Sequence, residues 1–112
     1  MRKQMIENAA FDVASQVRTV EDSIETALAE IAELQSKMIR ARAVAGVATA
    51  TGHAALEQLA AALQGLVTAR GGMAGCHAAL VDARKLVPGL RTVAFGDVSE
   101  CPDPEARLRV VA

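Results

Sequence analysis

The 112-residue chain is poor in the side chains that enzymes and nucleic-acid-binding domains use most. It has no Trp, no Tyr and two Phe, so we expect neither base-stacking platforms nor an aromatic-lined substrate pocket. Twelve basic and thirteen acidic residues give a formal net charge of −1, so no strong field attracts DNA, RNA or an anionic membrane. We therefore expect no nucleic-acid partner and no small-molecule substrate.

Residues that could hold a metal ion or attack a substrate are equally scarce. The His and Cys residues are His53, Cys76, His77 and Cys101, and they show no C-x-x-C or H-x-x-x-H spacing. Cys76 and His77 are adjacent, so on a helix their side chains diverge by about 100° and do not form a nucleophile–base pair. Phosphate-binding, dinucleotide-binding and serine-hydrolase motifs are absent. The sequence predicts no enzyme, no cofactor and no metal site.

Long uncharged apolar runs are also missing. No stretch of 18 such residues occurs, so a membrane-spanning helix is not expected. Glu7 and Asp12 follow the basic start of the chain where a secretory signal would place an apolar run. Two cysteines are too few for a disulfide framework. These features favour a cytoplasmic protein with reduced thiols.

A heptad pattern in the N-terminal third is the strongest positive signal. Apolar residues recur from Ile6 to Ala41 with steps that alternate between four and three, and no Pro or Gly interrupts them. This pattern predicts a helix over about 4–44 with a coiled-coil-like seam. The predicted interaction residues on this helix are Val13, Val17, Val20, Ile24, Ile31, Leu34 and Met38.

The apolar side of this first helix is wider than a two-stranded coil requires. Ala9, Ala14 and Leu28 lie beside the seam and extend it, which favours a bundle of three or four helices. Because a helix with one apolar side is not stable alone in water, another helix must cover it.

The middle of the chain predicts a turn followed by a second helix. Residues 43–81 carry only two charged side chains, Glu57 and Arg70. Gly46 and the segment 49–52 favour a hairpin turn, with Thr51 capping a helix over about 51–87. The alternative is one long helix that runs through both Gly46 and Gly52, since each glycine costs only about 1 kcal/mol there.

The second helix continues the seam less regularly than the first. Its predicted interaction residues are Leu56, Leu59, Leu63 and Leu66, and the same phase places Arg70 and His77 in the seam. Gly71-Gly72 and Gly75 either kink or end this helix, or allow another backbone to approach closely. Pro88-Gly89 ends the helical region, so residues 1–89 form the predicted hairpin domain.

Residues 90–112 are predicted to form a short irregular tail. The segment starting at Asp103-Pro104 has the signals of a helix N-terminus, and a short helix is favoured there. A strand at 108–111 that pairs with 91–95 is the alternative.

Together these features predict an all-α fold, a long antiparallel helical hairpin that forms a four-helix bundle as a dimer. Such a chain acts by protein–protein interaction, as a scaffold, adaptor or assembly component. Its expected partners are a second copy of itself and another protein. The alternative is a small regulator or inhibitor that binds a different protein through the same helical face. A membrane-active hairpin is the third hypothesis, because small residues such as Gly46 and Gly75 occur at membrane-helix contacts.

Overall fold

Two long helices make up the described part of the chain. The computed structural model describes residues 2–87, in which α1 spans Arg2–Ala45 and α2 spans His53–Arg84. No strand occurs within residues 2–87, so the fold is all-α, as the heptad pattern predicts. The predicted stop at Pro88-Gly89 and the predicted tail, residues 90–112, lie outside the described residues.

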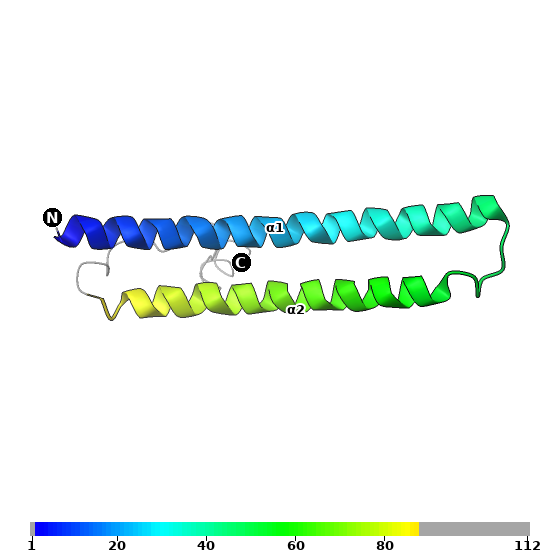
Figure 1. Ribbon diagram of the computed structural model, residues 1–112. Helices are drawn as coiled ribbons and strands as arrows, with labels where there is room; N and C mark the ends of the chain where they lie inside the picture. Colours follow the sequence, from blue (N-terminus) through cyan, green and yellow to red (C-terminus); the bar gives the residue numbers. More distant parts are fainter. Residues whose placement is uncertain (1, 88–112) are drawn as a thin grey trace, which may run out of the picture. The chain divides into compact units, whose positions relative to one another are not determined.

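The chain divides into two compact units, and each contains a segment of both helices. Within the described residues the terminal unit consists of 2–20 and 73–87, and the turn unit is Glu21–Gly72. In each unit the segment of α1 lies beside an antiparallel segment of α2 (Figure 1). The turn unit also contains the connection between the helices, so it is a complete helical hairpin.

Two glycines produce the turn between the helices. Gly46, with φ +67°, ends α1, and its N–H donates to the carbonyl oxygens of Arg42 at 3.1 Å and Ala43 at 3.2 Å. Gly52, with φ +80°, precedes α2 and accepts a hydrogen bond from the Leu56 N–H at 3.2 Å. Both glycines adopt the left-handed conformation that other residues avoid. The chain therefore forms a hairpin rather than one long helix.

The predicted cap of the second helix is wrong by one residue. Because the first hydrogen bond within α2 uses the Gly52 carbonyl, Gly52 occupies the capping position rather than Thr51. The Thr51 N–H instead donates to Ala48 O at 3.0 Å within the turn. The reversal of chain direction requires the positive φ of Gly52, and this requirement outweighs the side-chain cap that a threonine offers.

The helix α2 does not end at its cluster of glycines. It continues through Gly71-Gly72 and Gly75 to Arg84. A Cβ built on any of these three glycines would meet no neighbouring atom within 4 Å. The described part of the chain therefore brings no other backbone close to them.

The buried residues of the described chain all lie in the terminal unit. Ala10, Ala14 and Val17 follow each other at helical spacing on α1, and His77 lies on the facing segment of α2 with 4% of its surface exposed. Three of these four positions carry alanine or valine, so the two helix segments can pack closely. In residues 21–72 no side chain is buried to the same degree.

Candidate functional site

On α1 the predicted interaction residues are covered to very different degrees. Val17 is buried, whereas Val13 and Leu34 keep 43% and 48% of their surface exposed. The remaining residues of the set are half-buried: Val20, Ile24, Ile31 and Met38. Ala14 is buried and Leu28 is half-buried, although the heptad pattern puts both beside the seam. In the terminal unit the covered side of α1 therefore includes Ala14 and leaves the seam residue Val13 exposed. In the turn unit it includes Leu28 and leaves Leu34 at the open edge of the seam.

On α2 the predicted interaction residues are also only partly covered. Leu56, Leu59 and Leu66 are half-buried, and Leu63 keeps 37% of its surface exposed. Val67, one turn after Leu63, is exposed as well. Pairing of the two helices in the turn unit thus leaves large apolar side chains in contact with water.

The two polar residues in the seam of α2 have different surroundings. His77 is the buried polar residue of the terminal unit. Arg70 is exposed in the turn unit, where its Nε donates a hydrogen bond to Glu25 Oε1 on α1. This hydrogen bond and the negative charge of Glu25 raise the pKa of Arg70 above its ordinary value. The ion pair shows that Arg70 of α2 lies opposite Glu25 of α1 in the turn unit.

The outer surface of α2 is unusual because its central part carries almost no charged side chains. Arg70, paired with Glu25, is the only charged residue in the 24 positions from Gln58 to Val81. Helices at a protein surface ordinarily carry charged residues on the side away from the core. Here the exposed positions are mostly small residues: Ala60, Ala61, Ala62, Gly65, Ala69, Gly71, Gly72, Ala74, Gly75, Cys76, Ala78 and Ala79.

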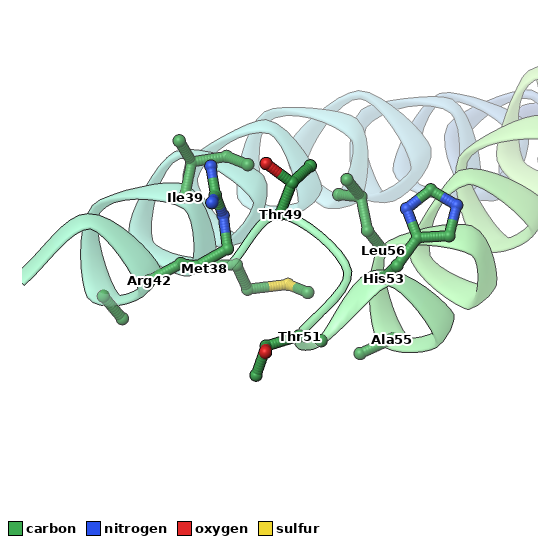
Figure 2. A pocket seen from close by; sticks show the side chains of 10 residues that line it. Met38, Ile39, Arg42, Thr49, Thr51, His53, Ala55 and Leu56 are labelled. Atoms are coloured by element: carbon green, nitrogen blue, oxygen red, sulfur yellow. The ribbon is translucent and has the colours of Figure 1, made fainter. Parts of the chain in front are cut away.

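A pocket of about 360 Å³ lies at the turn, within the turn unit. The last turns of α1, the connecting segment and the first turn of α2 all contribute side chains to it (Figure 2). Met38, Ile39 and Leu56 supply its large apolar side chains, and Arg42 supplies a cationic one. The heptad pattern does not predict this pocket, because the lining residues belong to three segments that become neighbours only when the turn forms.

Few chemically reactive groups gather elsewhere in the described chain. Within residues 2–87 no three His, Cys, Asp or Glu side chains lie together in a way that could hold a metal ion. The Cys76 thiol is exposed and free of disulfide bonding. Neither α1 nor α2 contains a segment long and apolar enough to cross a bilayer.

Comparison with known proteins adds no assignment. No protein-family model matches this chain. No curated protein and no solved structure matches it either. Its function must therefore be inferred from two features of its own surface, the partly covered apolar seam and the pocket at the turn.

Proposed function

We propose that this chain is a non-enzymatic protein–protein interaction module that self-associates through the open edge of its apolar seam. Two hairpins would pair in a dimeric four-helix bundle, which acts as a cytoplasmic scaffold, adaptor or assembly component. The observation that carries this proposal is the exposure of Leu34 and Leu63 in the turn unit, at 48% and 37%.

The exposed residues are large, and they continue a regular pattern. Contact with water costs each of them part of the roughly 1.5–3 kcal/mol that full burial of such a side chain contributes. Isolated apolar residues are common on protein surfaces, but these lie at seam spacing beside half-buried neighbours such as Ile31 and Leu59. Side chains at such positions become buried when a third and a fourth helix pack against the pair.

The lack of charge on α2 favours a second copy over a different protein. Charged groups around an interface set partner choice and orientation, and α2 offers only the paired Arg70 between Gln58 and Val81. An uncharged surface of small residues is complementary to the same surface on a second copy, as in the two-fold interfaces of most homodimers. The second hypothesis, a regulator that binds a different protein through the same face, predicts a monomer in the absence of that protein.

Light scattering coupled to size-exclusion chromatography tests self-association directly. The purified chain at micromolar concentration should have the mass of a dimer. Leu63→Lys should weaken the dimer by at least about tenfold, since an ammonium group would be buried there without a partner. Ala29→Lys is the control, because it adds the same charge at an exposed position of α1 outside the seam, and it should leave the dimer intact.

Circular dichroism of each variant shows whether the helices persist. A lysine at position 63 is compatible with the single chain, because Leu63 is already partly exposed and a lysine stem can lie along apolar surface. If Leu63→Lys nevertheless unfolds the chain, Leu34→Lys and its neighbour Gln35→Lys form a second matched pair. A monomeric parent would exclude self-association and favour the regulator. Equal dimer affinity of both members of a pair would exclude the proposed face.

A further inference from the structure

The pocket at the turn combines an apolar interior with one cationic group. Its volume of about 360 Å³ lies near the lower end of the roughly 300–1,000 Å³ found for small-molecule sites. Met38 and Leu56 are half-buried and Ile39 is partly exposed, so an alkyl chain could contact all three. Ala41 and Ala55 complete the apolar lining.

The polar groups of the lining favour a negatively charged ligand. The Arg42 side chain is half-buried and makes no ion pair with another residue in 2–87. Thr49 and Thr51 line the pocket and carry hydroxyl groups that can donate hydrogen bonds. No carboxylate belongs to the lining. The Oε1 atom of the nearby Glu57 lies 2.9 Å from the Nε2 atom of His53. Figure 2 shows Arg42, the two threonines and His53 around the pocket.

The direction of α2 adds to the same preference. His53 and Ala55, in the first turn of this helix, line the pocket. The first turn of a helix carries backbone N–H groups without partners in the helix and a partial positive charge. Arg42, the Thr49 hydroxyl and this helix end each favour an anionic group in the cavity.

We propose that this pocket binds a small amphipathic anion, a medium-chain carboxylate. The carboxylate would accept hydrogen bonds from the Arg42 guanidinium and the Thr49 hydroxyl, which lie on the same side of the pocket (Figure 2). The alkyl chain would lie against Met38, Ile39 and Leu56. The pocket shares Met38 and Leu56 with the seam, but neither Leu34 nor Leu63 lines it, and its charged group comes from the last turn of α1.

Calorimetric titration of the full chain with three probes of equal chain length tests the head-group preference. Octanoate should bind with a saturable isotherm. Octanol should bind about tenfold more weakly, since it lacks the charge-assisted hydrogen bonds to Arg42. Octylammonium should bind still more weakly, because its charge has the same sign as that of Arg42. If octanoate does not bind, or binds no more tightly than octylammonium, the proposal is wrong.

Two pairs of variants locate the site. Arg42→Gln should weaken octanoate binding about tenfold and leave octanol binding unchanged, whereas Arg40→Gln removes an exposed charge outside the lining and should change neither. Ala55→Leu should fill the pocket and weaken both probes, whereas Ala54→Leu, outside the lining, should not. Equal behaviour within either pair contradicts the assignment. Light scattering on the same samples reports dimerisation separately, so that one proposal can fail while the other stands.

Discussion

Replacing Leu34 by alanine distinguishes a lone two-helix chain from a bundle. Truncation of a fully buried leucine costs about 2.7–5 kcal/mol, of which a large part is the lost transfer free energy. In the single chain 48% of Leu34 is exposed, so only about half of the lower value, roughly 1 kcal/mol, would be lost. If a second copy covers Leu34, we expect a loss of about 3 kcal/mol per chain.

Val17→Ala provides the internal reference for this measurement. Val17 is buried within the single chain, so removal of its two methyl groups costs about 1.5–2 kcal/mol whether or not the chain dimerises. The assay is urea unfolding followed by circular dichroism at two protein concentrations. For a dimer the unfolding midpoint rises with concentration, and Leu34→Ala should lose more stability than Val17→Ala.

The opposite ranking would refute the reasoning. If Leu34→Ala costs about 1 kcal/mol or less and the midpoint of the parent is the same at both concentrations, no second copy covers Leu34. Leu34 would then stay exposed to water in the functional protein, and the open edge of the seam would not be an interface.

Two further predictions concern the turn and the buried histidine. Gly46→Ala and Gly52→Ala should each lower the free energy of unfolding by about 1 kcal/mol in urea unfolding, because both positions have positive φ; a variant as stable as the parent would contradict the turn geometry. His77→Ala should lower the free energy of unfolding by about 1–3 kcal/mol in urea unfolding, because the side chain is buried. Cys76→Ala, at the exposed neighbouring position, should change it by no more than about 0.5 kcal/mol. A larger loss for Cys76→Ala than for His77→Ala would show that His77 does not contribute to the packing.

The helices and the turn could be predicted from the sequence because they depend on local signals. The regular steps from Ile6 to Ala41, without Pro or Gly, predict the long α1. Gly46 and Gly52 provide the positive φ that a reversal needs. Gly71 and Gly72 carry the same residue type, yet α2 continues through them. A glycine permits a turn without requiring one, so the sequence alone does not decide whether α2 ends at these glycines.

The covered side of the seam could not be predicted, because a heptad repeat defines a line along the helix and not the rotation of the helix about its axis. The heptad pattern predicts the same burial for Val13 and Val17, yet Val17 is buried and Val13 is exposed. Ala14, which the heptad pattern puts beside the seam, is buried as well, so the covered side of the helix does not coincide with the line of seam residues. The pocket is missed for a related reason, since Arg42, Thr49 and Leu56 become neighbours only when the turn closes.

The composition of α2 is a second reason to regard the hairpin as part of a larger bundle. Gly65, Gly71, Gly72 and Gly75 each weaken a helix by about 1 kcal/mol relative to alanine, and within the described chain none of them allows a close contact that would offset this cost. A hairpin selected only for its own stability would have alanine or charged residues at these outer positions, which favour both helix formation and solubility. Enclosure of α2 by a second copy accounts for the small residues and the missing charges together, whereas an exposed α2 accounts for neither.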